Sequence, residues 1–225
     1  MKMKSIIAAT ALVAGSATAQ SPFEGVYGQI GVGYEQTKPT HDSGQIDVTG
    51  VGSFPLSAAH STSQGFTGVV GVGYMAPISS SFLLGLGVEY APLAGSTASH
   101  TSLMNGTVIG TGTYQKQSMY NIFLSPATPI GKDGLLYGKI GYSGAAVKFT
   151  IDSTSNTYNF TGYSLGIGYK QIIKGGLYGF AEGNYFAYGN QTNTTDFSRA
   201  GLRIQSTATE NATAYNLLVG LGYKF

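Results

Sequence analysis

The sequence contains three histidines, and histidine is the side chain best suited to general acid–base catalysis or metal binding near neutral pH. They are His41, His60 and His100, and all three fall in polar segments that we interpret as loops. No serine or acidic residue stands at a spacing that would bring a nucleophile and a base together on one strand. We therefore predict solvated histidines, no catalytic residues and no enzymatic activity.

Two further patterns suggest ligand chemistry. His41 is close to Asp42 and Asp47, but three oxygen or nitrogen ligands in one flexible loop are a weak pattern for a metal site. Residues 28–33 contain glycines in the order G-x-x-G-x-G, which differs from the dinucleotide fingerprint, and no helix follows them. We predict neither a metal ion nor a cofactor.

Four charged residues are expected on the inward face of the strands. Lys139 and Glu182 occupy similar depths on two strands that have one strand between them. A lone charge in a dry interior is costly, so we predict an interior charge pair between Lys139 and Glu182. Glu35 and Glu89 lie nearer the loop ends of their strands. We expect these two carboxylates to contact water or another partner.

The elements that position these residues are strands. After residue 20, apolar residues recur at every second position in stretches of about ten residues, which places alternate residues on opposite faces of a strand. We count eight such stretches, and short turns alternate with long polar segments between them. The long segments, which we interpret as loops, are residues 37–63, 91–113, 150–159 and 190–210.

The N-terminus has the pattern of a secretory signal peptide. Lys2 and Lys4 precede a short apolar segment at 6–13, and Ala17-Thr18-Ala19 forms an A-x-A cleavage site. The apolar segment is shorter than the roughly 20 residues that a transmembrane helix needs. We predict a signal peptide at residues 1–19 and one barrel domain at residues 20–225.

The charge and composition exclude a nucleic-acid-binding protein. Without Lys2 and Lys4, ten of the twelve lysines and arginines remain against ten aspartates and glutamates, so no basic surface is expected. Charged residues make up 10% of the chain, against about 25% in soluble domains. This composition, with 34 glycines and 16 tyrosines, is typical of a transmembrane barrel.

The direction of the apolar face decides between two kinds of barrel. A soluble barrel of the lipocalin kind would need its apolar face inside, and here the opposite face carries glycine, Asn, Gln, Glu and Lys. The apolar face would then lie in water and cause aggregation, so we predict that it contacts lipid. In a bilayer every backbone group must be paired, which requires a closed barrel. We predict an all-β, eight-stranded antiparallel up-and-down transmembrane β-barrel in the outer membrane of a Gram-negative bacterium.

Aromatic residues lie near the ends of the apolar faces, where amphipathic rings meet the membrane–water interface. We predict that they form an aromatic girdle. Its members are Tyr34, Tyr74, Tyr90, Tyr142 and Tyr169.

The final strand carries the most specific motif. Apolar residues alternate up to a C-terminal aromatic residue: Leu217, Val219, Leu221, Tyr223 and Phe225. The chain resembles the small outer-membrane barrels of the outer-membrane protein A and outer-membrane protein X kind over residues 23–225. The resemblance implies that this final segment is the assembly signal read by the barrel-assembly machinery.

The resemblance also implies a role in envelope structure, adhesion or surface interaction. The expected partners are outer-membrane lipid, lipopolysaccharide and an extracellular or host surface ligand that binds the loops. An eight-stranded interior is just wide enough for side chains to fill it. A narrow gated pore for small solutes or ions is the alternative function, and a barrel-embedded lipid-modifying enzyme is a further one.

Overall fold

The structure is a computed structural model that describes residues 21–93, 95–151, 154–199 and 201–225. The predicted signal peptide lies outside these residues. None of the described residues forms a helix that is long and apolar enough to cross a membrane. The strands are β1 (Gly25–Val48), β2 (Gly52–His60), β3 (Ser63–Ser79), β4 (Phe82–Ala91), β5 (Ala98–Met104), β6 (Thr107–Ile130), β7 (Gly134–Ile151), β8 (Thr154–Lys174), β9 (Leu177–Arg199) and β10 (Leu202–Lys224).

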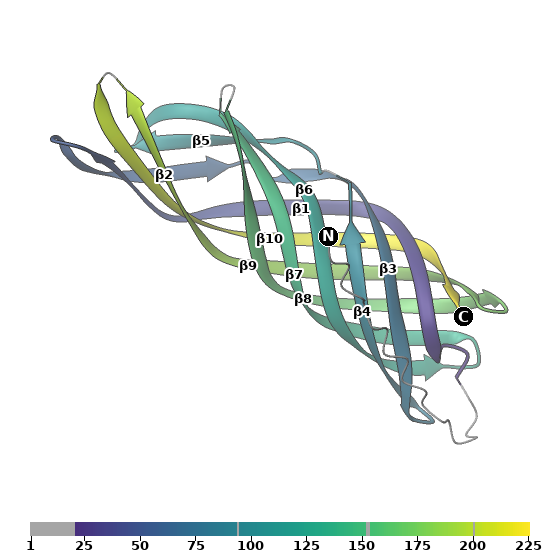
Figure 1. Cartoon of the computed structure of the whole chain (residues 1–225). Coiled ribbons are helices and arrows are strands. Elements are labelled where there is room, and N and C mark those ends of the chain that lie inside the picture. Colours follow the sequence, from purple (N-terminus) through teal and green to yellow (C-terminus); the bar gives the residue numbers. More distant parts are fainter. Residues whose placement is uncertain (1–20, 94, 152–153, 200) are drawn as a thin grey trace, which may run out of the picture.

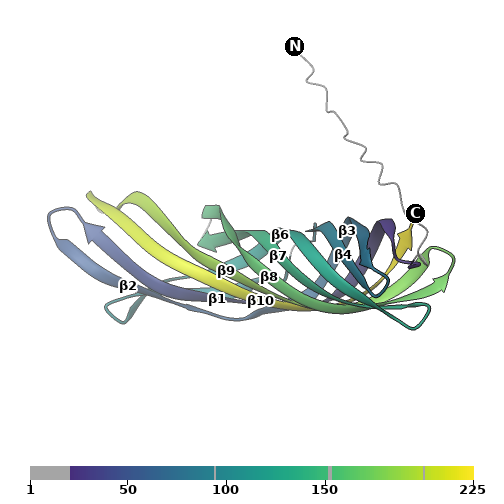
Figure 2. The same cartoon turned by 90° about the horizontal axis from the view of Figure 1, so that it is seen from below.

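Eight of the ten strands form a closed antiparallel ring. Its order is β1, β3, β4, β6, β7, β8, β9 and β10, and β10 pairs with β1 to close it. The closing ladder runs from the pair Tyr27–Lys224 to the pair Val48–Ile204. Figures 1 and 2 show the ring as an elongated, tilted barrel. The prediction of an eight-stranded up-and-down barrel is confirmed.

The two faces of the barrel wall follow the predicted alternation. On β1, Val26, Ile30 and Val32 are exposed, whereas Tyr27 and Gln29 are buried inside the ring. The register of β9 is also as predicted, because Glu182 and Asn184 are buried and Ala181 faces outward. The outward set is apolar, so the wall is suited to contact lipid hydrocarbon.

Large side chains and glycines share the interior. Tyr137 leans across Gly168, and Tyr178 leans across Gly222, so closely that a methyl group at either glycine would overlap the ring. Phe123, Phe180, Phe186 and Tyr188 are also buried inside. Side chains of this size fill the interior of an eight-stranded barrel.

The end of the barrel with long connections differs from the sequence prediction. Outer-membrane barrels have short periplasmic turns and longer extracellular connections, which makes this end extracellular. We expected polar loops there, but most of these residues continue the strands. Strands β1, β6, β9 and β10 are 24, 24, 23 and 23 residues long, although about 9–11 residues cross the hydrocarbon. The loop prediction was therefore wrong for most of these residues.

Strands β2 and β5 belong only to this extracellular part. β2 pairs with β1 and β5, and β5 pairs with β2 and β6, so the two strands continue the sheet where β3 and β4 do not reach (Figure 1). The turn from β5 to β6 is Asn105-Gly106, with φ values of 50° and 77°. Two successive residues at positive φ are typical of a type I′ turn, which suits the twist of a hairpin.

Candidate functional site

The centre of the barrel contains a buried ion-pair cluster. Lys139 on β7 is 2% exposed, and its Nζ lies 2.9 Å from Glu182 Oε1 on β9. The same Nζ lies 2.6 Å from Glu89 Oε2 on β4 and 4.2 Å from the centre of the Phe123 ring. One ammonium thus bridges two carboxylates across the interior. We name Lys139, Glu89 and Glu182 the central cluster.

Neutral side chains complete the hydrogen bonds of the central cluster. The Tyr137 hydroxyl donates to Glu182 Oε2 over 2.8 Å, and Asn184 Nδ2 donates to Glu182 Oε1 over 2.7 Å. Gln29 Nε2 donates to Glu89 Oε1 over 3.3 Å, and Tyr178 in turn donates to Gln29 over 3.2 Å. A buried charge is tolerated when it is both paired and hydrogen-bonded, and both carboxylates meet this condition.

Glu35 and Glu89 were expected to contact water or another partner, and each is paired with a buried lysine. Glu89 is part of the central cluster, and Glu35 forms a buried ion pair with Lys116 of β6 nearer the extracellular end. The Thr37 hydroxyl also donates to Glu35, over 3.4 Å. Lys116 belongs to the segment of β6 that joins the membrane part to the extracellular part. Alternation from Met119 and Asn121 would have placed it outside, because the register shifts between Lys116 and Ser118.

A third buried lysine lies toward the periplasmic end. Lys170 on β8 is buried among three tyrosine rings. Its Nζ lies 3.8 Å from the centre of the Tyr27 ring, 4.9 Å from that of Tyr178 and 5.2 Å from that of Tyr137. A cation over the face of an aromatic ring is stabilised by the negative charge of that face. The sequence analysis did not identify this lysine.

The three histidines are the largest departure from the sequence analysis. They do not lie in solvated loops, but on β1, β2 and β5, with their side chains turned into the extracellular part of the barrel. Glu210 of β10 lies between two of them, because its Oε1 is 3.3 Å from His60 Nε2 and 4.0 Å from His41 Nδ1. The centres of the His60 and His100 rings are 5.9 Å apart. We name these four residues the histidine cluster.

The strand pairing explains how the histidine cluster forms. His41 is opposite Glu210 in the ladder between β1 and β10, and His60 is opposite His100 in the ladder between β2 and β5. A bulge follows His41 on β1, where the register shifts before Ser43. Bulges re-aim neighbouring side chains, and this one lies at the level of the cluster. Among the described residues, no three histidine or acidic side chains are arranged to hold a metal ion.

Aromatic rings surround the histidine cluster. His60 packs edge-on against Tyr114 and Phe149, and His100 packs edge-on against Phe149. Burial lowers the pKa of His100, and the nearby His60 lowers it further, whereas Glu210 raises it. Burial also raises the pKa of the Tyr114 hydroxyl to about 12, so this group is neutral under physiological conditions.

Aromatic residues on the outer wall form four cross-strand pairs. Each of the eight barrel strands contributes one ring. The pairs are Tyr34 with Phe66, Tyr90 with Tyr120, Tyr142 with Tyr163, and Tyr185 with Tyr215. The predicted girdle residues Tyr34, Tyr90 and Tyr142 lie in this ring of aromatic residues. Tyr74 and Tyr169 are exposed nearer the periplasmic end.

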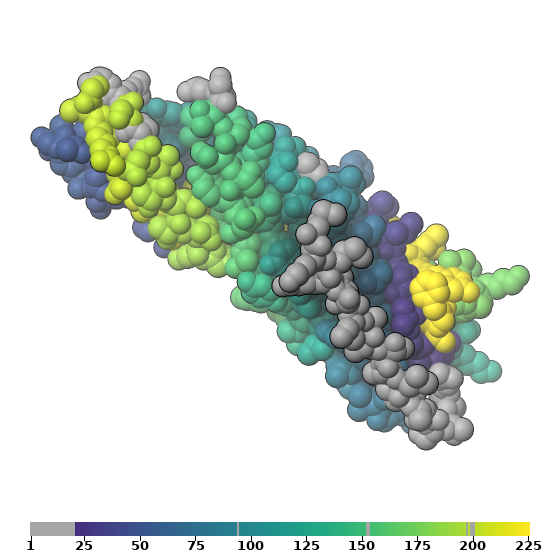
Figure 3. All heavy atoms as spheres, viewed as in Figure 1, coloured from purple at the N-terminus to yellow at the C-terminus, as the bar shows by residue number. Residues whose placement is uncertain are grey.

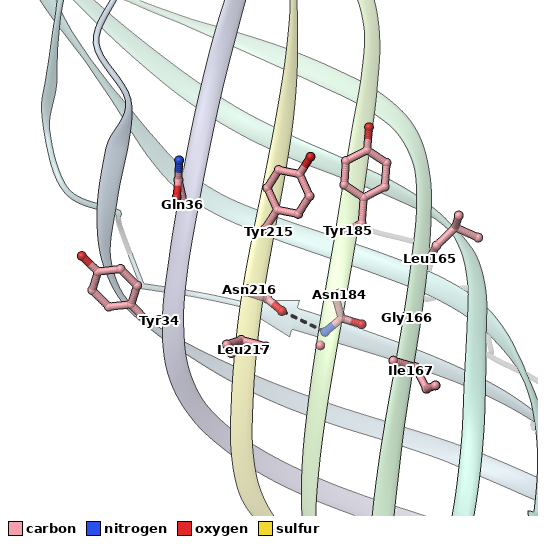
Figure 4. A pocket seen from close by; sticks show the side chains of 11 residues that line it. Tyr34, Gln36, Leu165, Gly166, Ile167, Asn184, Tyr185, Tyr215, Asn216 and Leu217 are labelled. Atoms are coloured by element: carbon pink, nitrogen blue, oxygen red, sulfur yellow. Dashed lines mark hydrogen bonds between the residues drawn. The ribbon is translucent and has the colours of Figure 1, made fainter.

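A hollow in the outer wall lies beside one of these pairs. Its volume is about 570 Å³, and side chains of β1, β8, β9 and β10 line it (Figure 4). Gly183 has no side chain to fill the outward space between Leu217 and Ile167. The lining is mainly apolar and faces lipid, so this hollow is suited to contact lipid chains.

The residues of the predicted assembly signal face outward along β10. Leu217, Val219, Leu221 and Tyr223 are exposed. Phe225 is also exposed; its backbone N–H donates to the Val26 carbonyl over 2.9 Å, and its ring packs edge-on against Tyr223. These residues therefore form one continuous apolar row. Recognition of this row by the assembly machinery stays a prediction.

The extracellular part is open on one side. β8 pairs with β9 only between the level of Gly162–Tyr188 and the periplasmic end. Above that level, β8 continues with β7 and β9 continues with β10, and the two hairpins diverge (Figure 1). Figure 3 shows both hairpins, in green and yellow-green, at the same end of the elongated body. We name the gap between residues 154–161 of β8 and residues 189–199 of β9 the seam.

The sequence matches the outer membrane protein beta-barrel domain family over residues 5–225. The outer membrane protein OprG of Pseudomonas aeruginosa has a similar structure, with a TM-score of 0.58 and 14% identity over 91% of this chain and 98% of that chain. Ail, the attachment invasion locus protein of Yersinia pestis, aligns with a TM-score of 0.40 and 16% identity over 90% and 99% of the two chains. No curated protein matches the sequence significantly.

Proposed function

The chain belongs to the outer membrane protein beta-barrel domain family and lies in the outer membrane, and on this basis we propose that it is a surface interaction protein. Its extracellular strands bind a ligand outside the cell, and the membrane part is the rigid support. The observation that carries this proposal is the length of the strands, because they extend well beyond the hydrocarbon as paired β-structure. Binding usually resides on exposed segments that a rigid scaffold positions.

The outer surface of the longest hairpin supports a binding role. β9 and β10 remain paired up to Arg199 and Leu202, and their exposed polar residues include Thr192, Thr194, Thr195, Asp196, Ser198, Arg203 and Gln205. Hydroxyl groups face each other in the cross-strand pairs Thr192–Thr209, at 2.8 Å, and Thr194–Thr207, at 3.2 Å. This surface is ordered and polar, and its donors and acceptors are accessible to a protein or glycan.

The seam offers a second mode of binding. Among the described residues, the facing backbone edges of β8 and β9 above Gly162 have no strand between them. Exposed edges of this kind pair with an additional extended chain. We infer that an extended segment of a partner protein pairs with these edges.

The filled interior of the membrane part also supports a surface interaction role over a pore. Lys139 bridges Glu89 and Glu182, and Tyr137 and Phe123 occupy the space around them. An ion crossing the barrel would have to displace this cluster. A narrow gated pore is the second candidate function, and it would require the central cluster to open.

One deletion tests the proposed function. Removing Thr192–Thr209 and joining Gln191 to Glu210 by an Asn-Gly turn shortens the hairpin and retains the pair Gln191–Glu210. We expect the variant to fold, to show heat-modifiable gel mobility and to lose adherence of displaying cells to epithelial cells and matrix-coated plates.

Planar-bilayer recording on the same deletion variant distinguishes the two candidates. Unchanged adherence would contradict the interaction proposal. A steady conductance that survives the deletion and changes with Lys139→Gln would favour the pore.

A further inference from the structure

The histidine cluster has buried nitrogens that nothing in the described structure satisfies. Eight buried side-chain nitrogen or oxygen atoms have no hydrogen-bond partner, and five of them belong to His41, His60 and His100. His60 has a side chain that is 2% exposed, and both of its ring nitrogens are in this set, since Glu210 Oε1, although 3.3 Å from Nε2, does not have the geometry of a hydrogen bond to it. Buried polar groups are normally satisfied, so such a concentration needs an explanation.

The hydrogen bond of His41 fixes which of its ring nitrogens carries the proton. His41 Nε2 lies 3.0 Å from the carbonyl oxygen of Leu56 on β2, and this oxygen can only accept. His41 therefore carries its proton on Nε2, which leaves Nδ1 as a bare acceptor 4.0 Å from Glu210 Oε1. Two acceptors face each other there. A proton added to Nδ1 would turn this unfavourable contact into an ion pair.

The single carboxylate limits how many protons the cluster tolerates. Glu210 faces His60 and His41, and it can compensate one added charge. The other polar or titratable groups that face the cluster are the Tyr114 hydroxyl, which donates to the Ser61 carbonyl, and Tyr158, whose ring packs against Phe149. The Lys116 ammonium, one inward position along β6 from Tyr114, is already paired with Glu35. Three imidazolium groups against one carboxylate would leave two uncompensated buried charges.

We propose that the histidine cluster is an acid-sensitive latch that holds β2 against β5 and β1 at neutral pH and releases it in acid. Glu210 can compensate one added charge, but the rings of His60 and His100 face each other across the ladder that joins β2 to β5, with their centres 5.9 Å apart. Like charges at this separation in a buried site repel, and the strands separate so that water reaches the rings.

The strand that would move, β2, is weakly held. β2 pairs with β1 through only four residues, from Gln45–Pro55 to Val48–Gly52, and with β5 through five. Neither β2 nor β5 belongs to the closed ring of eight strands. Release would therefore open the extracellular end and leave the membrane barrel intact. This inference does not depend on the ligand of the proposed function.

The sign of the pH effect follows from linkage. Burial lowers the pKa of His100, so His100 takes up a proton at a higher pH when β2 has separated from β5 than when the two strands are packed. As the pH falls below the ordinary histidine pKa of about 6.5, the detached state gains stability relative to the packed state. Glu210 opposes this trend, so its removal must shift the release to a higher pH.

Hydrogen exchange of the mature protein in lipid nanodiscs tests the latch. Exchange is measured at about pH 7.5 and pH 5.0 and corrected for the intrinsic effect of pH. We expect residues 52–60 and 98–104 to lose protection in acid, about tenfold for each unit by which the pKa differs between packed and detached histidines. Residues 26–32 of the membrane barrel are the internal control.

Two variants make the test specific. His100→Phe keeps a ring against Phe149 but cannot take a proton, so the acid response should be weaker or shifted to a lower pH. Glu210→Gln should shift it to a higher pH, which a merely structural role would not do. If His100→Phe does not fold, the direction of the Glu210→Gln shift decides alone.

Three results would overturn the proposal. The first is unchanged protection of the wild type in acid, and the second is a shift to a lower pH in Glu210→Gln. The third is an increase in protection with Zn²⁺ at neutral pH that requires His60 and His100, because the cluster would then be a metal site.

Discussion

The central cluster and the histidine cluster both bury ionisable groups inside the same barrel, but they differ in how these groups are satisfied. In the central cluster, Lys139 lies within 3 Å of both Glu89 and Glu182, and neutral side chains donate to the remaining carboxylate oxygens. In the histidine cluster, Glu210 lies near two imidazoles, and five ring nitrogens have no partner. The first group is complete and the second is not.

The two clusters differ in this way because they lie in different parts of the barrel. The central cluster lies inside the closed ring, where strands are paired on both sides and water is excluded. A permanent charge there is tolerated only if it is fully compensated. The histidine cluster lies at the extracellular end, where His60 and His100 belong to β2 and β5, which are not strands of that ring, and groups that are neutral at rest can remain incompletely paired there. We therefore expect a pH-dependent change of structure only at the extracellular end.

Breaking the central cluster should have the largest effect. Lys139→Met leaves two buried carboxylates without their cation, and removing one partner of a buried ion pair costs about 3–5 kcal/mol. We expect this loss in the free energy of unfolding, measured by urea titration in lipid vesicles. Lys148→Met is the matched control, because Lys148 is exposed on the same strand and should have little effect.

A compensated variant sharpens this first prediction. Glu89→Gln and Glu182→Gln, added to Lys139→Met, remove the charges that were left unpaired. Stability should then recover in part, since polar amides can keep the hydrogen bonds of Gln29 and Tyr137. Equal instability of the single and triple variants would contradict the charge argument.

The lipid-facing wall at the same level should show the next largest effect. Leu86 is 57% exposed, halfway along β4 and opposite Leu124 of β6. Arginine at the bilayer midplane costs about 2–4 kcal/mol in transmembrane barrels, so Leu86→Arg should lose this amount in the same urea titration. Leu86→Phe is the control and should be close to wild type. A harmless arginine would mean that this face does not meet hydrocarbon.

The interior position next to Leu86 is not a neutral control. A methyl group at Gly87 would overlap the ring of Phe123, which itself packs on Lys139. A serine there would disturb the central cluster. We therefore expect Gly87→Ser to lower stability as well, through a different mechanism.

The membrane part could be predicted from the sequence because its signal is local. Apolar residues at every second position assign each side chain to one face, and this rule placed Lys139 and Glu182 inside and Leu86 outside. The sequence analysis expected Lys139 to pair with Glu182 but did not identify Glu89 as its second partner. Glu89 lies on β4, with β6 between it and Lys139 on β7, and the contact depends on the curvature of the closed ring.

The extracellular part was predicted less well for a different reason. Residues such as those at 190–210 are rich in threonine, serine and asparagine, which gives no contrast between an inward and an outward face. The strand pattern was therefore read as loop. His60 and His100 could be located only once the ladder between β2 and β5 was known, and bulges near His41 shift the register further.

The smallest effect is expected on the polar hairpin. Thr192→Val removes the hydroxyl that faces Thr209 at 2.8 Å and retains the β-branched shape. Thr209 is then free to hydrogen-bond water, so no buried group is left unsatisfied. Cross-strand pairs contribute about 0.2–1 kcal/mol, and we expect a local loss of this size, with the free energy of unfolding of the barrel unchanged. Hydrogen exchange at residues 190–196 measures the local stability of the hairpin, and urea titration measures the free energy of unfolding of the barrel. A loss as large as that of Lys139→Met would show that the hairpin and the barrel unfold as one unit. The separation between a permanently compensated centre and an adaptable extracellular end would then fail.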